Sequence, residues 1–165
     1  MHRRLLIVVL VLSLAACGDS RLPEYELSGN AMGTTFNVVL VNPADDLANE
    51  ALHTGILATL ERINDLASTW KPDSELSVLN ATETTEWTPV SAELCTLLED
   101  ALEISRLSDG AFDVTVGPLV NLWGFGPDGS VGTPPSDEAL EAAMQSVGYE
   151  RLETRCREPA VRKAT

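Results

Sequence analysis

The sequence is poor in basic residues, and this shortage excludes one class of partner. Only 11 of its 165 residues are Lys or Arg, against 25 Asp or Glu. Between residues 5 and 150, four basic residues face 23 acidic ones, so this part carries a net charge of −19. Such a surface repels phosphate backbones, and we therefore expect no nucleic acid among the partners.

The sequence also lacks an apolar run long enough to cross a bilayer. The longest run, residues 5–16, is apolar apart from Ser13. As a helix it would span about 18 Å, short of the roughly 30 Å hydrocarbon core. It follows Arg3-Arg4 and ends at Leu14-Ala15-Ala16-Cys17, which resembles the bacterial lipobox. We expect a signal peptide over 1–16, lipidation of Cys17 and a lipidated leash over 17–28; the alternative is an ordinary secretory signal with a chance cysteine.

Cysteine is scarce, with three residues in the chain. Lipidation would use Cys17 and leave Cys95 and Cys156. Cys95 falls inside an apolar helical pattern and Cys156 in a basic C-terminal segment, so the sequence favours two free thiols. Pairing in an exported chain is the alternative.

The patterns that are present mix helices with strands. Residues 34–42 are β-branched and apolar and predict a strand, with residues 24–27 as a possible partner. Apolar residues recur every three or four positions over residues 45–66, from Ser91 to about Gly110, and over 136–148, which predicts three amphipathic helices. Residues 149–154 predict a further strand. Because glycine-rich loops of the Rossmann or P-loop kind are absent, this mixture favours an α+β fold of one domain.

Three segments contain more special residues than a plain connection needs. Residues 29–36 place two glycines before a strand, where the backbone either approaches a ligand or simply turns. Residues 68–80 place Trp70 in a polar loop before a short helix with Ser74 as its cap; the indole either stacks on a planar ligand or covers the end of the core. Residues 109–126 hold four glycines, three aromatic residues and two carboxylates, and Asp113 there either binds a ligand or caps a turn.

Taken in order, these segments resemble the N-terminal half of the FAD:protein FMN transferases, the ApbE-type flavin transferases. The similar stretches are Ala31-Met32-Gly33-Thr34-Thr35-Phe36, then Ser68-Thr69-Trp70 with Asp73-Ser74-Glu75-Leu76-Ser77-Val78-Leu79-Asn80, then the run from Gly110 to Gly126. The resemblance extends from about Gly29 to at least Val147. It implies an ApbE-like fold of helices and antiparallel strands, with residues 29–165 as the N-terminal part of an incomplete domain.

The resemblance also implies an activity. Members of the family cleave FAD with the help of Mg2+, move FMN onto a Thr or Ser hydroxyl of a target flavoprotein and release AMP. The implied target is a flavin-accepting subunit of a membrane redox complex. The implied location is the periplasmic side of a bacterial membrane, through the lipid anchor, with the inner membrane favoured over the outer.

Five residues match family positions that contact FAD: Met32, Trp70, Ala111, Phe112 and Asp113. Trp70 stands where many members have a tyrosine, so the aromatic plane is kept and the phenol hydroxyl is lost.

The sequence offers no cluster of carboxylates and hydroxyls at a spacing suited to Mg2+, so we expect the metal ligands mainly beyond residue 165 and assign no catalytic residue. If the three predicted helices pack on strands expected beyond residue 165, the chain alone would expose an apolar face. One alternative function is a lipid-anchored lipoprotein that binds flavin or a partner without catalysis. A structural envelope lipoprotein is another, favoured if Trp70 and residues 110–126 are buried core.

Overall fold

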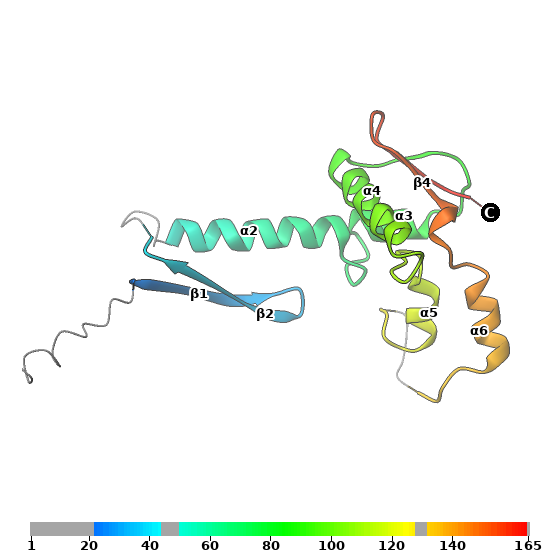
Figure 1. Cartoon of the computed structure of the whole chain (residues 1–165), viewed down its shortest axis with the longest axis horizontal. Helices are drawn as coiled ribbons and strands as arrows, with labels where there is room; N and C mark the ends of the chain where they lie inside the picture. Colours follow the sequence, from blue (N-terminus) through cyan, green and yellow to red (C-terminus); the bar gives the residue numbers. More distant parts are fainter. Residues whose placement is uncertain (1–21, 44–49, 128–131, 165) are drawn as a thin grey trace, which may run out of the picture. The chain divides into compact units, whose positions relative to one another are not determined.

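The computed structural model describes residues 22–43, 50–127 and 132–164 (Figure 1). The predicted signal peptide and the predicted lipidation site at Cys17 lie outside these residues. The chain divides into two compact units, one up to Leu57 and one from Ala58 onward. Within the described ranges, no helix has the length and apolar character needed to cross a membrane.

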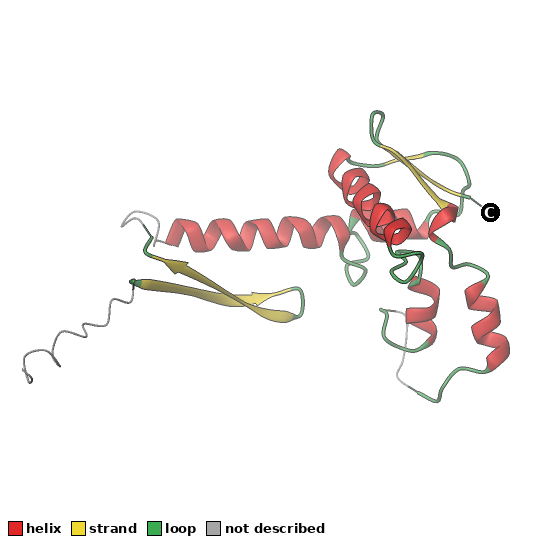
Figure 2. Cartoon of the chain, in the orientation of Figure 1, coloured by secondary structure: helices red, strands yellow, loops and turns green. Residues whose placement is uncertain are grey.

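The first unit contains an antiparallel hairpin of β1 (Glu24–Ala31) and β2 (Thr34–Val41), drawn as the paired yellow arrows in Figure 2. Both predicted strands are confirmed, and β1 takes up residues 24–28 of the expected leash. The connecting residues Met32 and Gly33 have φ of 52° and 74°, the left-handed pair that matches the twist of a tight hairpin.

The residue opposite Gly29 in the hairpin leaves no room for a side chain at position 29. Gly29 pairs with Phe36, and a Cβ at Gly29 would lie 2.7 Å from Cε1 of that ring. The ring of Phe36 therefore covers the backbone of Gly29. Glycine weakens a strand, and this cross-strand contact stabilises the pairing register of the hairpin at that position.

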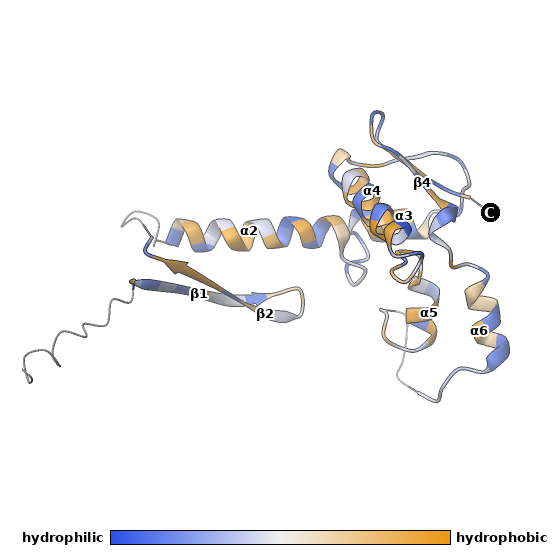
Figure 3. Cartoon of the chain, in the orientation of Figure 1, coloured by the Kyte–Doolittle hydropathy of each residue, from blue (hydrophilic) through white to orange (hydrophobic). Residues whose placement is uncertain are grey.

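Helix α2 (Glu50–Ala67) follows the hairpin and has the predicted five turns, although residues 45–49 of the predicted range lie outside the described part. Hydrophobic and hydrophilic residues alternate along it in Figure 3, as the periodicity predicts.

The second unit contains α3 (Glu75–Ala81), α4 (Ala92–Leu107), α5 (Gly117–Leu122) and α6 (Asp137–Met144). Ser74, Ser91 and Ser136 cap three of them, each accepting a hydrogen bond at its side-chain oxygen from the backbone amide three residues on. The predicted starts of these helices are confirmed. The helix predicted over 136–148 ends earlier, at Met144, and residues 109–126, for which no helix is predicted, contain α5.

A small antiparallel sheet closes the second unit, with β3 (Thr88–Pro89), β5 (Ala160–Lys163) and β4 (Leu152–Arg155) in that order. The strand predicted over 149–154 begins only at Leu152, because Tyr149–Arg151 form a 3₁₀ turn after Gly148. Trp87, directly before β3, lies under two guanidinium groups, those of Arg155 at 4.6 Å and Arg162 at 5.0 Å from its ring centroid.

The core of this unit joins the end of α2 to α3, α4 and β5. Its buried members are Leu66, Leu79, Leu94, Leu98 and Val161. Lys163, at the end of β5, donates hydrogen bonds from Nζ to the carbonyl oxygens of Leu79, Asn80 and Thr82 at 2.7, 3.0 and 2.8 Å. The C-terminal strand thus also caps the last turn of α3, where helix carbonyls otherwise lack partners.

Cys95 and Cys156 form a disulfide, with their Cα atoms 5.6 Å apart, so the prediction of two free thiols is wrong. Cys95 is fully buried on the inner face of α4, as its place in the apolar pattern indicates. The prediction fails because the sequence does not show where Cys156 lies in the fold. β5 has too short and too basic a sequence to be recognised as a strand, and its pairing with β4 brings the turn that carries Cys156 onto α4.

Candidate functional site

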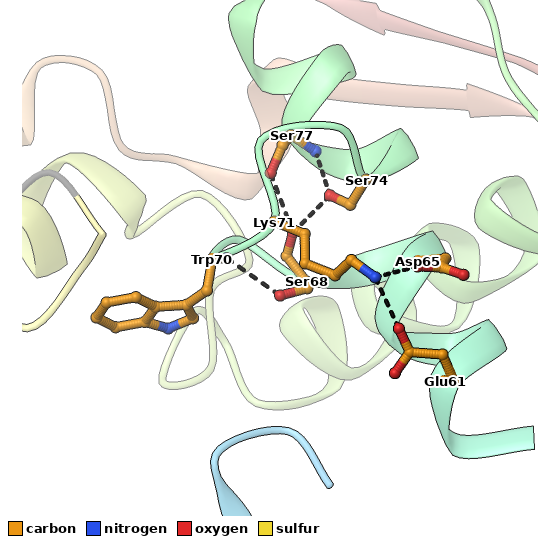
Figure 4. A network of polar contacts seen from close by, with 7 residues as sticks. All are labelled: Glu61, Asp65, Ser68, Trp70, Lys71, Ser74 and Ser77. Atoms are coloured by element: carbon orange, nitrogen blue, oxygen red, sulfur yellow. Dashed lines mark hydrogen bonds and ion pairs between the residues drawn. The ribbon is translucent and has the colours of Figure 1, made fainter. Parts of the chain in front are cut away.

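The loop between α2 and α3 presents Trp70 to solvent. The side chain of Trp70 is 68% exposed, which contradicts the alternative that it covers the core. In Figure 4 the indole points away from the polar side chains that surround the base of the loop. The exposed face of the indole is available for stacking, so Trp70 qualifies as a contact for a planar ligand.

The loop itself is closed by hydrogen bonds. Ser74 Oγ donates to the carbonyl oxygen of Ser68 at 2.5 Å, and Ser77 Oγ donates to the same oxygen at 3.0 Å. The backbone amide of Trp70 donates to Ser68 Oγ at 3.1 Å, and that of Ser74 donates to the carbonyl of Lys71 at 3.1 Å. Both ends of the loop are therefore tied to each other and to the first turn of α3.

Lys71, next to Trp70, is anchored on α2. Its ammonium binds Asp65 and, at 2.8 Å, Glu61 (Figure 4). The hydrogen bond to Asp65, followed by the one to Glu61, raises the pKa of Lys71, so the side chain stays charged at neutral pH. An exposed ion pair alone contributes little stability, but here two pairs fix the side chain next to Trp70.

Asp113 binds its own chain. Its Oδ1 accepts hydrogen bonds from Thr115, from the amide at 2.7 Å and from the hydroxyl at 2.6 Å. Its Oδ2 accepts one from the amide of Tyr149 at 2.9 Å, and Thr115 Oγ1 accepts one from the amide of Gly148 at 2.7 Å. We call these four residues the Asp113 clamp. The turn-capping role that the sequence left open is the role this carboxylate has in the structure; contact with FAD stays a prediction.

The clamp fixes the segment next to it. Phe112 precedes Asp113 and is exposed, as are Trp123 and Phe125 beyond α5. Desolvation raises the pKa of the Tyr149 phenol, whose ring lies 3.5 Å from where a Cβ on Gly110 would be. Apart from the buried Gly126, residues 110–126 are exposed or partly exposed, so the condition for the structural-lipoprotein alternative is not met.

Met32 lies in the first unit, at the hairpin turn, and its side chain is exposed. Residues 30–35 line an open hollow of about 460 Å³. A φ of 52° is unusual for methionine, because Asn, Asp or Gly normally occupy this turn position. Residues held in such conformations cluster at ligand sites.

The structure brings Ala111, Phe112 and Asp113 together in one turn, with Trp70 in the same unit and Met32 in the other. Sequence reasoning missed Ser68, Thr115 and Tyr149. Thr115 lies two residues after Asp113, a spacing at which an aspartate commonly accepts a bond from a backbone amide. The link to Tyr149 has no sequence signal, since 36 residues separate the partners.

The described residues contain no metal centre built from several ligating side chains. No group of three or more His, Cys, Asp or Glu side chains within the described ranges is arranged to hold one. The carboxylate of Asp113 is used by three hydrogen bonds, and those of Asp65 and Glu61 by Lys71.

Comparison with known proteins identifies the class. A model of the ApbE family matches residues 32–165. The chain is 40% identical over 152 residues to the FAD:protein FMN transferase of Vibrio cholerae, covering 92% of this chain and 45% of that protein. It is 39% identical over 147 residues to the one of Haemophilus influenzae, covering 88% and 42%. The chain thus spans less than half the length of these curated relatives.

Solved structures agree. The flavin transferase ApbE of Vibrio cholerae superposes with a TM-score of 0.79 at 39% identity, over 86% of this chain and 45% of that one. The flavinyl transferase ApbE of Pseudomonas stutzeri, in its apo form, gives 0.79 at 33% identity, over 88% and 48%. The fold is that of the flavin transferases, helices with antiparallel strands as predicted. The chain belongs to the ApbE family.

Proposed function

We propose that the protein acts as an FAD:protein FMN transferase. The observation that carries the proposal is Trp70, an exposed indole on a closed loop in a chain 40% identical to an enzyme of that name. In the proposed reaction, a Thr or Ser hydroxyl oxygen of a target protein bonds to the FMN phosphorus of FAD. The bond from that phosphorus to the bridging oxygen breaks, and AMP leaves with this oxygen and receives the hydroxyl proton.

In this proposal each candidate residue has a role set by its surroundings. Trp70 offers the face of its ring to the flavin. Phe112, held by the Asp113 clamp, supplies further apolar contact. Met32, at the hairpin turn, stays a separate candidate contact that rests on the family resemblance. Ala111 and Asp113 lie in the same turn as Phe112. Ala111 is exposed and has a small side chain, so a ligand can approach the backbone of this turn.

The family resemblance implies Mg2+ as the ion that neutralises charge on the pyrophosphate. The described residues hold no site for it, and we therefore route no step through the metal. We further propose, from the sequence, anchoring through a lipid on Cys17 at the periplasmic side of a bacterial membrane, the inner one favoured. The proposed target is a flavin-accepting subunit of a membrane redox complex.

One observation favours a second candidate, a lipid-anchored lipoprotein that binds flavin or a partner without chemistry. It is the exposed Trp70, because stacking of a flavin on an aromatic face requires no metal and no reaction.

FAD binding and AMP release separate these candidates. The chain is titrated with FAD by equilibrium dialysis, and then incubated with FAD and Mg2+ while AMP is measured by chromatography. The transferase and a flavin-binding lipoprotein both predict FAD binding that weakens about tenfold in Trp70→Ala, since stacking of a ring on an aromatic side chain contributes about 1–3 kcal/mol.

The control is Leu107→Ala, which removes another exposed large apolar side chain and should leave FAD affinity unchanged. AMP release supports the transferase, and binding without AMP release supports the second candidate. A wild-type chain that does not bind FAD contradicts the transferase and leaves, of the second candidate, only a lipoprotein that binds a partner.

A further inference from the structure

The side chain of Ser74 has two hydrogen-bonding roles at once. Its Oγ accepts from the amide of Ser77 at 3.0 Å, which caps α3, and it donates to the carbonyl of Ser68 at 2.5 Å. A serine cap needs only the first of these bonds. The second bond reaches back six residues and closes the loop that carries Trp70.

Ser74 is also the buried end of this loop. It is 1% exposed, whereas Trp70, four residues earlier, is 68% exposed. The buried hydroxyl makes both of its bonds within the chain, so the loop has one fixed anchor and one exposed tip (Figure 4). Polar groups that are fully bonded inside a protein hold a single arrangement of the backbone around them.

The remaining contacts of the loop act in the same direction. The carbonyl of Ser68 receives a second donor from Ser77, and Ser68 Oγ receives the amide of Trp70 itself. On the other side of Trp70, the ammonium of Lys71 is bound by Glu61 and Asp65 of α2. The backbone on both sides of the indole is thus fixed before any ligand arrives.

We infer that Ser74 is a positioning residue for flavin: it acts through Trp70, by holding the loop so that the indole is ordered before FAD binds. This inference rests on the proposed function. A ring that is already ordered loses less conformational freedom when a planar ligand stacks on it, so affinity is higher than for a mobile loop. Ser74 itself need not touch the ligand.

Ser91 provides a matched control. It caps α4 with nearly the same backbone angles, φ −65° and ψ 154° against −63° and 150° for Ser74. It accepts the corresponding amide bond, from Leu94 at 3.1 Å. Ser91→Ala therefore removes the same kind of helix cap as Ser74→Ala, while the bond to Ser68 is left in place.

The first measurement is made without ligand. In a chain whose other two tryptophans, Trp87 and Trp123, are replaced by Phe, the decay of fluorescence anisotropy reports the mobility of Trp70. Ser74→Ala should add a nanosecond component that Ser91→Ala does not add. Ser77→Ala, which removes one donor to Ser68 but keeps the cap, should add a smaller one. Equal anisotropy decay in all variants overturns the inference.

The second measurement is a double-mutant cycle of Ser74→Ala and Trp70→Ala, in which the affinity for FAD is measured. Ser74→Ala should weaken FAD binding about three- to tenfold when Trp70 is present, the range expected for ordering a mobile side chain on binding. It should change affinity little in a Trp70→Ala background, because the residue acts only through Trp70. Ser91→Ala should leave affinity unchanged in both backgrounds.

The outcomes distinguish the inference from the function on which it rests. FAD binding by the wild-type chain with equal weakening by Ser74→Ala in both backgrounds would show a general structural role and overturn the inference. A wild-type chain that does not bind FAD would overturn the proposed function, and the anisotropy decay would still decide whether Ser74 holds the loop.

Discussion

The Asp113 carboxylate illustrates how one residue can serve the fold in a segment that resembles a ligand site. Three hydrogen bonds from Thr115 and Tyr149 use both of its oxygens. From the sequence, a turn cap and a ligand contact were equally open, because both need an acceptor at this place. In the structure the carboxylate caps the turn, because its hydrogen-bond donors are Thr115 and Tyr149 of the same chain.

We expect Asp113→Asn to lower the free energy of unfolding by about 1–2 kcal/mol. An amide group has one acceptor oxygen where the carboxylate has two, so an amide donor of the clamp loses its partner. The measurement is urea denaturation followed by circular dichroism. Asp100→Asn, at an exposed position of α4, is the control and should change stability by less than about 0.5 kcal/mol. Equal stability of the two variants would contradict the role of the clamp.

At the scale of helices and strands, local signals were sufficient for some elements and not for others. The starts of α3, α4 and α6 follow from serine caps that act within three residues, and β2 follows from a run of β-branched and apolar residues. α5 and β5 have no such signal. α5 has six residues and no capping side chain, and β5 exists because β3 and β4 pair with it.

The same limit explains the missed disulfide. Whether Cys156 reaches Cys95 depends on how β4 and β5 pack on α4, which involves residues 61 apart in sequence. The residues proposed to contact FAD likewise follow from the resemblance alone, while Tyr149, which binds Asp113 from 36 residues away, acts through the tertiary structure.

We expect loss of the Cys95–Cys156 disulfide to cost about 4 kcal/mol of unfolding free energy, because it closes a loop of 61 residues in the unfolded chain. Denaturation by urea with and without a reducing agent measures this difference. The variant Cys95→Ala/Cys156→Ala should be destabilised to a similar extent, and the reducing agent should then have no further effect. Identical stability of the oxidised and reduced chains would contradict the expectation.

At the scale of the whole molecule, the chain combines a net charge of −14 with many exposed apolar side chains. Among the described residues sixteen large hydrophobic side chains are exposed, with Leu107 and Phe125 at 79% and 71%. Apolar contact favours self-association, whereas the shared negative charge opposes it.

We therefore expect self-association that increases with protein concentration and with salt, since salt screens the repulsion and leaves the apolar attraction. Sedimentation velocity over a range of concentrations at about 0.05 and 0.5 M NaCl, on either side of physiological ionic strength, measures it. The double variant Leu107→Ser/Phe125→Ser should associate less at both salt concentrations. A wild-type chain that is monomeric throughout, with sharp and concentration-independent thermal unfolding, would contradict this expectation.

The two lysines can be used to measure local opening of the molecule, through the rates at which they are acylated. Lys71 and Lys163 are the only lysines in the sequence, and each side chain binds one end of the region around α3: Lys71 the Trp70 loop, and Lys163 the last carbonyls of the helix. Acylation requires a free, accessible amine. The two ion pairs of Lys71 raise its pKa and keep the amine protonated, whereas burial lowers the pKa of Lys163 and its Nζ is shielded by three carbonyl oxygens, so each lysine reacts slowly until its contacts open. The rate at which each lysine is acylated thus reports separately how often the loop and the C-terminal strand open.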